Sequence, residues 1–96
     1  MLHFPNQSRV FDRTRRAVHF WGHDSAMEWS FFVGEHALKR LQRDMLPDEA
    51  GFLRAFDFNR ALIQAAALKA YKRERKAWYE LAANDFVTTS PLSGGK

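Results

Sequence analysis

The chain has 96 residues, of which 46% are hydrophobic and 27% charged, and its formal net charge is +4. This length suits one domain, and nine Phe, three Trp and two Tyr exclude the aromatic-poor composition of disordered chains. Because cysteine is absent, disulfide staples, thiolate metal sites and cysteine nucleophiles are also excluded. No apolar run approaches the ~20 residues that span a bilayer, and no secretory signal is recognised, so the expected location is cytoplasmic.

The first third of the chain shows the alternation of β-strands. Strands are expected near residues 10–11, 17–21 and 27–33, separated by polar residues 12–15 and by the turn-rich residues 22–25. Successive side chains of a strand point to opposite faces. The odd positions of the third strand should therefore be buried; they are Met27, Trp29, Phe31 and Val33. The short turns favour an antiparallel meander.

Helical spacing begins after Gly34. Apolar residues recur three and four positions apart over residues 35–44, which predicts a first helix. Asp48, just after Pro47, is the expected N-cap of a second helix over residues 48–74. At 1.5 Å per residue that helix would be about 40 Å long, whereas a compact domain of this size is roughly 32 Å across. The second helix must therefore kink, protrude or lie against a second copy.

The last part of the chain alternates again before its composition changes. Residues 77–81 are rich in aromatics and predict a short fourth strand, with a last helical turn as the alternative. Residues 1–87 are expected to form a single domain, and residues 88–96 a disordered C-terminal tail. The predicted fold class is α+β, an antiparallel three- to four-stranded meander with two helices packed on one face, in the order β-β-β-α-α-β.

Short segments along most of the chain have the order and spacing of a known family. They are Phe4-Pro5-Asn6, Phe11-Asp12, Arg16-Ala17-Val18, Phe20-Trp21-Gly22-His23-Asp24, Glu28, Ser30-Phe31-Phe32-Val33, Phe56-Asp57, the region of Tyr71, and Tyr79-Glu80-Leu81 with Asn84-Asp85-Phe86. Over roughly residues 3–86 the sequence resembles the domain of unknown function 1488 family of small bacterial proteins. The resemblance implies a small α+β fold with a meander and helices. It implies no known catalysis, so no functional residues are carried over.

Three patterns that could carry chemistry have the wrong geometry for it. His19 and His23 share a strand face, but four strand residues span about 13 Å, whereas a zinc ion holds its nitrogens at about 2.0–2.1 Å. The run His23-Asp24-Ser25 has the residue types of a hydrolase triad, but adjacent side chains do not converge, and Asp24 is expected to bond nearby backbone in a turn. Gly94-Gly95-Lys96 lacks the strand and helix that flank a phosphate-binding loop. We predict no catalytic, cofactor-binding or metal-binding residues.

Basic residues gather near the end of the second expected helix and in the first hairpin. Aromatic residues flank the helix end, and aromatic side chains among cations can stack on bases. A helix C-terminus also favours cations without any ligand, and no known nucleic-acid motif is present. The candidate nucleic-acid contacts are Arg13, Arg15, Arg16, Lys72, Arg73, Arg75 and Lys76.

A second candidate surface follows from the alternation of the strands. If Val18 and Phe20 face the helices, His19, Trp21 and Phe32 lie on the opposite face of the sheet. Exposed aromatics that are contiguous often mark contact surfaces, although the long helix or the tail could cover them. The sequence therefore favours a non-enzymatic interaction or accessory protein that binds itself, as a homodimer, or another protein. Nucleic-acid binding is the alternative, and an unrecognised enzyme is the second alternative; no membrane partner is expected.

Overall fold

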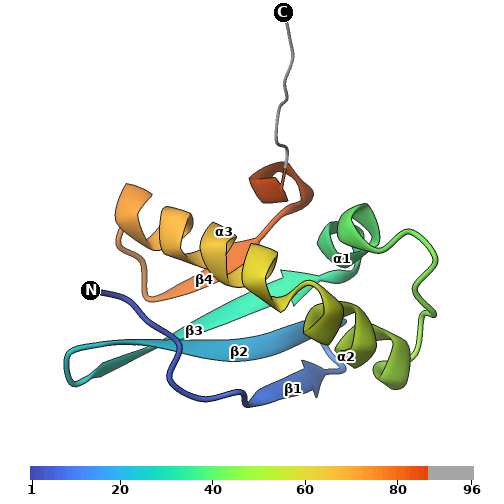
Figure 1. Ribbon diagram of the computed structural model, residues 1–96, viewed down its shortest axis with the longest axis horizontal. Helices are drawn as coiled ribbons and strands as arrows, with labels where there is room; N and C mark the ends of the chain where they lie inside the picture. The colour runs from blue at the N-terminus through green and yellow to red at the C-terminus, as the bar shows by residue number, and fades with distance from the viewer. Residues whose placement is uncertain (87–96) are drawn as a thin grey trace, which may run out of the picture.

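The computed structural model describes residues 1–86, so the expected tail at residues 88–96 lies outside the described residues. A four-stranded sheet is covered on one face by a layer of helices (Figure 1). The elements are β1 (Arg9–Asp12), β2 (Ala17–Asp24), β3 (Met27–Gly34), α1 (Glu35–Leu41), α2 (Glu49–Phe58), α3 (Arg60–Arg73), β4 (Trp78–Leu81) and the 3-10 helix η1 (Ala83–Phe86). The predicted α+β class and the order of strands, helices and strand are confirmed. None of the helices in this part of the chain is long and apolar enough to cross a bilayer.

The sheet has the order β1-β2-β3-β4, and its first three strands form the predicted antiparallel meander. The fourth strand pairs with β3 in parallel, with Ser30 opposite Trp78 and Val33 opposite Leu81. The reason is the path of the helices, which carry the chain back along the sheet. α3 ends near the β2–β3 hairpin, so β4 starts from that end of the sheet, with Trp78 opposite Ser30, and runs in the same direction as β3 (Figure 1).

The predicted long helix is broken into α2 and α3 at Asn59. This residue has φ −114° and ψ 21°, outside the helical range, and its side-chain Nδ2 donates to the carbonyl of Ala55 at 2.9 Å and to Oε1 of Gln42 at 3.3 Å. The expected N-cap is confirmed, because the Asp48 carboxylate accepts from the backbone N–H of Gly51 at 2.7 Å. Of the three outcomes open to an overlong helix, the chain adopts the kink.

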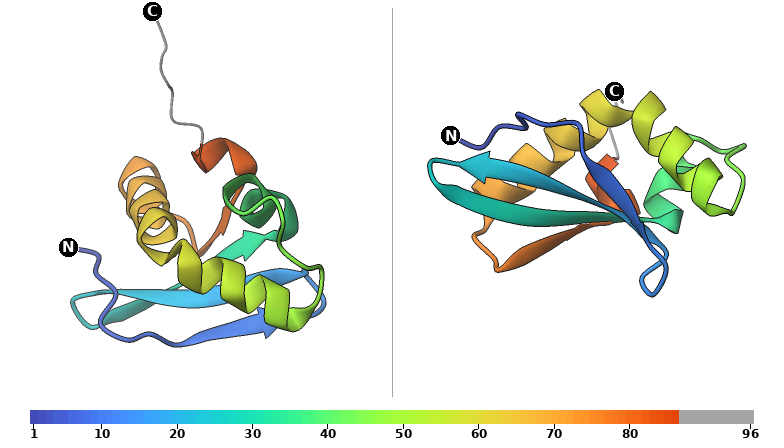
Figure 2. Two further views of the ribbon diagram at one scale, coloured as in Figure 1. Left: turned by 45° about the vertical axis from the view of Figure 1, so that its right-hand side comes forward. Right: turned by 90° about the horizontal axis from the view of Figure 1, so that it is seen from below.

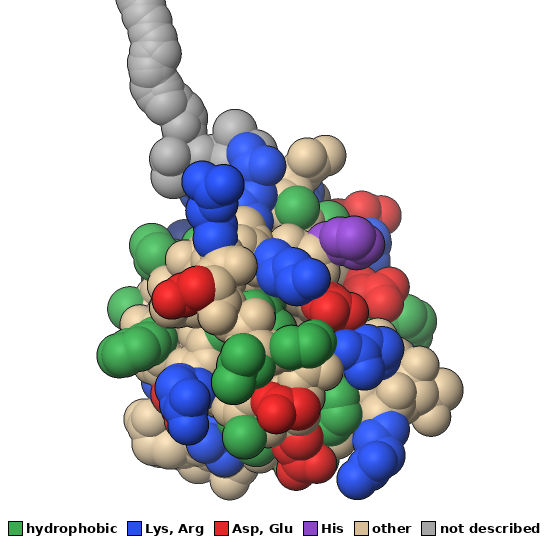
Figure 3. Space-filling view, turned by 90° about the vertical axis from the view of Figure 1, so that its right-hand side faces the viewer, with side chains coloured by type: hydrophobic (Ala, Val, Ile, Leu, Met, Phe, Trp, Pro, Cys, Tyr) green, Lys and Arg blue, Asp and Glu red, His purple; other side chains and the backbone are tan. Residues whose placement is uncertain are grey.

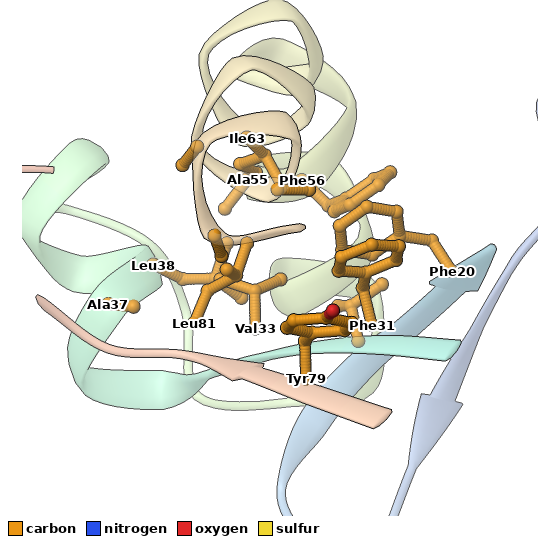
Figure 4. Packing of buried hydrophobic residues seen from close by; sticks show 14 of the residues in the cluster. Phe20, Phe31, Val33, Ala37, Leu38, Ala55, Phe56, Ile63, Tyr79 and Leu81 are labelled. Carbon is orange, nitrogen blue, oxygen red and sulfur yellow. The ribbon is translucent and has the colours of Figure 1, made fainter. Parts of the chain in front are cut away.

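The core lies between the sheet and the helices and is largely aromatic (Figure 4). Phe20 of β2 packs against Phe31 of β3, with ring centroids 5.5 Å apart, and against Phe56 of α2 at 5.1 Å. The ring of Tyr79 on β4 stacks on Phe31 at 4.9 Å. The largest fully buried side chains are Phe20, Phe31, Phe52, Phe56, Leu38, Ile63, Val18 and Val33. Each strand except β1 thus contributes a fully or almost fully buried residue to one continuous core.

The burial of the odd positions of β3 is confirmed for Phe31 and Val33, and Trp29 is half-buried against the core. Met27 differs, with 57% of its surface exposed, because it lies at the β2–β3 turn at the very end of the sheet. β2 also runs further than predicted, through Gly22 and His23 to Asp24. These residues pair with β3, from Gly22 opposite Trp29 to Asp24 opposite Met27, and the backbone of His3 also exchanges hydrogen bonds of 2.9 and 2.8 Å with that of His23.

Candidate contact surface on the open sheet face

Within residues 1–86, no helix packs on one face of the sheet, and we call this face the open face (Figure 2, right). Its residues follow from the strand register and from the alternation of side chains along each strand. They are Val10 and Asp12 of β1, Ala17, His19, Trp21 and His23 of β2, Glu28, Ser30 and Phe32 of β3, and Trp78 and Glu80 of β4. The prediction that His19, Trp21 and Phe32 lie opposite the helices agrees with this register.

Four of these residues form a continuous aromatic row, which we define as Trp21, His19, Phe32 and Trp78. The imidazole of His19 lies 4.1 Å from the Trp21 ring and 4.3 Å from the Phe32 ring, centroid to centroid. Phe32 meets Trp78 edge-on at 5.8 Å. Sequence reasoning placed the first three together but missed Trp78 as a member, because the pairing partner of residues 77–81 cannot be read from local alternation.

Arg15 joins this row from the β1–β2 turn. Its guanidinium carbon lies 4.4 Å from the centre of the Phe32 ring and 5.4 Å from that of Trp78. A carboxylate oxygen of Asp12 accepts from Arg15 Nη1 at 3.1 Å, and the other accepts from the Arg15 backbone N–H at 2.9 Å. That backbone hydrogen bond is the largest cause that lowers the pKa of Asp12. The open face therefore already holds one stacked guanidinium of the chain itself.

The row is partly open to solvent. Phe32 is 6% exposed, covered by its neighbours, whereas Trp78 at one end is 45% exposed and Val10 on β1 is 53% exposed. His19 and Trp21 are half-buried. Burial lowers the pKa of His19, and within residues 1–86 its Nε2 atom has no hydrogen-bond partner. The ring that the row exposes most to solvent is therefore that of Trp78, whereas Phe32 and the Nε2 atom of His19 are buried.

The charge of the open face differs in sign from that of the chain. Arg15 lies over this face, and the side chains of Asp12, Glu28 and Glu80 point to it. With the histidines counted as neutral, these four side chains carry a formal charge of −2. The whole chain carries +4. His23 Nε2 lies 3.5 Å from a carboxylate oxygen of Glu28. The open face is therefore aromatic and mildly acidic, and most of the cations lie elsewhere.

The candidate nucleic-acid contacts occupy two opposite ends of the molecule (Figure 1). Arg13, Arg15 and Arg16 lie in the β1–β2 turn, and Lys72, Arg73, Arg75 and Lys76 lie at the end of α3 and in the loop that leads to β4. Several are already in contact with the protein itself: Arg13 with Glu49 at 3.9 Å, Arg16 with Glu35 at 3.1 Å, Arg73 with Asp85 at 3.5 Å, Lys76 with Glu74 at 3.8 Å, and Arg75 over the Tyr71 ring at 4.1 Å. The structure does not bring the two groups together, and nucleic-acid binding stays a prediction.

The run His23-Asp24-Ser25 separates in the structure. His23 points to the open face, whereas the carboxylate of Asp24 turns to the helix side and accepts from the Tyr71 hydroxyl at 2.5 Å and from the Met1 amino group at 2.9 Å. The expected turn with Asp24 bonded to nearby backbone is wrong, because Asp24 is the last residue of β2 and its partners are distant. Within residues 1–86, no three His, Asp or Glu side chains converge as metal ligands.

The helix side of the molecule exposes apolar side chains in a different manner. Leu46, Phe58 and Leu62 are each more than half exposed. In the view onto the side with α1 and α2, hydrophobic side chains stand among charged ones of both signs (Figure 3). Rings in mutual contact, as on the open face, are a stronger sign of a contact surface than single apolar side chains among charges.

Comparisons with known proteins agree with this fold and add no activity. Residues 2–82 match the family described as "Protein of unknown function (DUF1488)". The structure is similar to the crystal structure of a protein of unknown function from that family from Shewanella loihica PV-4, with 19% sequence identity and a TM-score of 0.74 over 83% of this chain and 90% of that chain. No curated protein matches the sequence. At this identity the structural likeness concerns the fold alone.

Proposed function

We propose that this chain, which belongs to the DUF1488 family of proteins of unknown function, is a non-enzymatic binding module whose contact surface is the open face of its sheet. Membership confirms the resemblance that the sequence showed, and it supplies no activity to transfer. The observation that carries the proposal is the aromatic row, in which Trp21, His19, Phe32 and Trp78 follow one another at ring distances of 4.1 to 5.8 Å.

The physical argument starts from what an uncovered sheet face normally carries. An antiparallel sheet with one face on the core usually alternates apolar residues inward and polar residues outward. Here the outward positions on β2, β3 and β4 include two indoles and a phenyl ring. Aromatic residues are enriched in protein interfaces and among the residues that contribute most binding energy. A protein partner that covers Trp21 and Trp78 would remove this apolar surface from water.

The expected partner is a second copy of the chain or another protein, and the expected place of action is the cytoplasm. Sedimentation velocity over low to high micromolar concentrations measures self-association directly. We expect a mass that rises with concentration and that Trp21→Ser abolishes. Phe58→Ser is the matched control, because Phe58 is an exposed ring on the helix side, 75% accessible, and its loss should leave association unchanged.

A partner other than the chain itself needs a second assay. Random-peptide display against the immobilised protein should enrich sequences whose binding is lost in Trp21→Ser and kept in Phe58→Ser. The proposal is overturned if the protein is monomeric at every concentration and the enriched peptides bind Trp21→Ser as tightly as the parent protein.

Nucleic-acid binding, the alternative, is tested by fluorescence anisotropy of labelled DNA and RNA at low and near-physiological salt. Binding that neutralises phosphates weakens steeply with salt because counterions are released. Micromolar binding that persists at the higher salt, and is lost when Arg73 and Lys76 are both changed to Glu, would put the alternative in place of the proposal.

A further inference from the structure

A hollow of about 550 Å³ opens on the helix side of the molecule. Its walls come from α1, α3 and η1, and η1 lies between the two helices (Figures 1 and 2). Small-molecule sites in proteins are concave, mostly apolar and about 300–1,000 Å³ in volume. The large apolar side chains that line this hollow are those of Leu41, Leu62, Leu68 and Phe86. The hollow therefore has the size and the lining of a site for a small molecule.

The space on the α3 side of the hollow follows from the sequence of that helix. Leu62 and Lys69 lie seven residues apart, and residues three and four apart on a helix are neighbours on one face. Between them this face carries Ala65 and Ala66, which also line the hollow. Ala66 is buried against the core, whereas Ala65 is exposed. Because a methyl group is the whole side chain of Ala65, α3 leaves room there for a ligand without opening the core.

The hollow carries positive charge that the protein itself does not neutralise. Arg40 of α1 and Lys69 of α3 both line it, and within residues 1–86 neither forms an ion pair. Asp85 lines it too, but its carboxylate is already held. One oxygen accepts from the backbone N–H of Ala82 at 2.7 Å, and the other lies 3.5 Å from Nη2 of Arg73. Two unpaired cations therefore stand beside an apolar lining.

We propose that this hollow binds an amphipathic carboxylate, a small molecule whose carboxylate pairs with Arg40 and Lys69 and whose apolar body rests on the leucines and Phe86. A guanidinium presents parallel N–H donors that match the two oxygens of a carboxylate. The apolar lining removes the hydrocarbon part of the ligand from water. The inference goes beyond the proposed function, because the hollow lies on the helix side and uses no residue of the open face.

The chemistry of the lining disfavours other occupants. An apolar cation would be repelled by Arg40 and Lys69. A nucleic acid would bring phosphates, but it would set this strongly hydrated backbone against leucine and phenylalanine side chains, which offer no hydrogen bond. Residues 87–96 follow Phe86 directly in the sequence and contain no acidic side chain, so they offer the two cations no carboxylate side chain. A small molecule with both an apolar body and a carboxylate satisfies the whole lining.

NMR titration of the full chain with decanoate tests both parts of the inference. We expect the methyl signals of Leu62, Ala65 and Leu68 to shift and to saturate. Butyrate keeps the carboxylate and loses most of the apolar body, and decyltrimethylammonium keeps the chain and reverses the charge. Each should bind at least about tenfold more weakly than decanoate. Decyltrimethylammonium that binds as tightly as decanoate, or decanoate that gives no saturable shift, would overturn the inference.

A variant that fills the hollow locates the site. Ala65→Leu places a large side chain where the apolar body of the ligand should lie, and it should weaken decanoate about tenfold because that contact area is lost. Ala61→Leu is the matched control, since Ala61 is also exposed on α3 and does not line the hollow. Its affinity for decanoate should equal that of the parent protein. Thermal unfolding shows that both variants are folded.

Charge variants test the carboxylate. Lys69→Gln and Arg40→Gln should each weaken decanoate roughly threefold, in line with the strength of exposed ion pairs. Lys72→Gln and Arg43→Gln are the matched controls, because both residues are exposed cations outside the lining, and the affinity of these two variants should be unchanged. All four positions are exposed, so these variants keep the test valid if Ala65→Leu does not fold.

The outcomes separate this inference from the proposed function. Decanoate binding that the lining variants weaken, and that the controls and Trp21→Ser preserve, would establish the site independently of the open face. Binding that neither Ala65→Leu nor Lys69→Gln changes would place decanoate elsewhere and overturn the inference. Methyl signals of Leu62 and Leu68 that shift on dilution of the protein alone would show that a second copy fills the hollow, and would overturn it as well.

Discussion

The hydroxyl of Tyr71 donates a hydrogen bond of 2.5 Å to a carboxylate oxygen of Asp24, 47 residues earlier in the chain. The contact joins the C-terminal end of α3 to the β2–β3 hairpin. Arg75 lies in the loop that follows α3, and its guanidinium carbon is 4.1 Å from the centre of the Tyr71 ring. The loop therefore starts beside the contact between Tyr71 and Asp24. This contact helps to bring the chain back to the hairpin end of the sheet, from which β4 runs parallel to β3 with Trp78 opposite Ser30.

Tyr71→Phe should lower the melting temperature at neutral pH with the fold retained. The Tyr71 hydrogen bond is the largest cause that lowers the pKa of Asp24 in the folded protein. A carboxyl with a lowered folded pKa stabilises the fold above its unfolded pKa, and this stabilisation is lost as pH falls through the folded value. The variant should therefore lose less stability than the parent protein between pH 5 and strong acid, and thermal melts across that range would show it. Equal melting temperatures at neutral pH would rule out a stabilising hydrogen bond.

Gly51→Ala should destabilise the protein by about 1–3 kcal/mol through overpacking, although alanine is the better helix former. A Cβ atom at Gly51 would lie 2.1 Å from the backbone carbonyl oxygen of Leu46, and that contact has no flexible side chain to move. Gly34→Ala is the matched control, because nothing lies within 4 Å of a Cβ atom there. Urea unfolding measures both, and a stability of Gly51→Ala equal to that of Gly34→Ala would contradict the prediction.

His19 should titrate below the ordinary histidine range. Burial among the rings of Trp21 and Phe32 lowers its pKa, so the unfolded chain binds the proton first as pH falls. The stability contributed by neutral His19 is therefore full above about pH 6.5 and is lost as pH falls from there toward the folded pKa. NMR titration of the imidazole protons measures this pKa, and the His19→Gln spectrum assigns the resonance. A His19 pKa at or above the ordinary value would refute the prediction.

Asp57→Asn should reduce stability by roughly 0.5–1 kcal/mol, since exposed ion pairs contribute little. The carboxylate accepts from Arg9 at 2.9 and 2.7 Å and from Arg60 at 2.8 Å. The hydrogen bond from Arg9 is the first cause that lowers the pKa of Asp57. Its contribution is present above the unfolded pKa and is lost as pH falls, so the difference between Asp57→Asn and the parent protein should vanish at low pH. Denaturant titrations at neutral and acidic pH provide the comparison.

Local sequence patterns were enough to predict the strands, the start of α2 and three of the four residues of the aromatic row. Strand alternation separates His19 and Trp21 from Val18 and Phe20 because the pleat of a strand is a property of its own backbone. The N-cap at Asp48 is likewise local, since its carboxylate needs only an N–H three residues later, that of Gly51. These features hold whatever the rest of the chain does.

The tertiary structure decided what depends on partners distant in sequence. The break at Asn59 uses the side chain of Gln42, the parallel direction of β4 follows from the return path of α3, and Trp78 enters the aromatic row only through its pairing opposite Ser30. The same long-range packing places the basic residues of the β1–β2 turn and those at the end of α3 at opposite ends of the molecule. Periodicity in the sequence predicts on which side of its strand or helix a residue lies. The residues of other strands and helices that it contacts are determined by the packing of the whole chain.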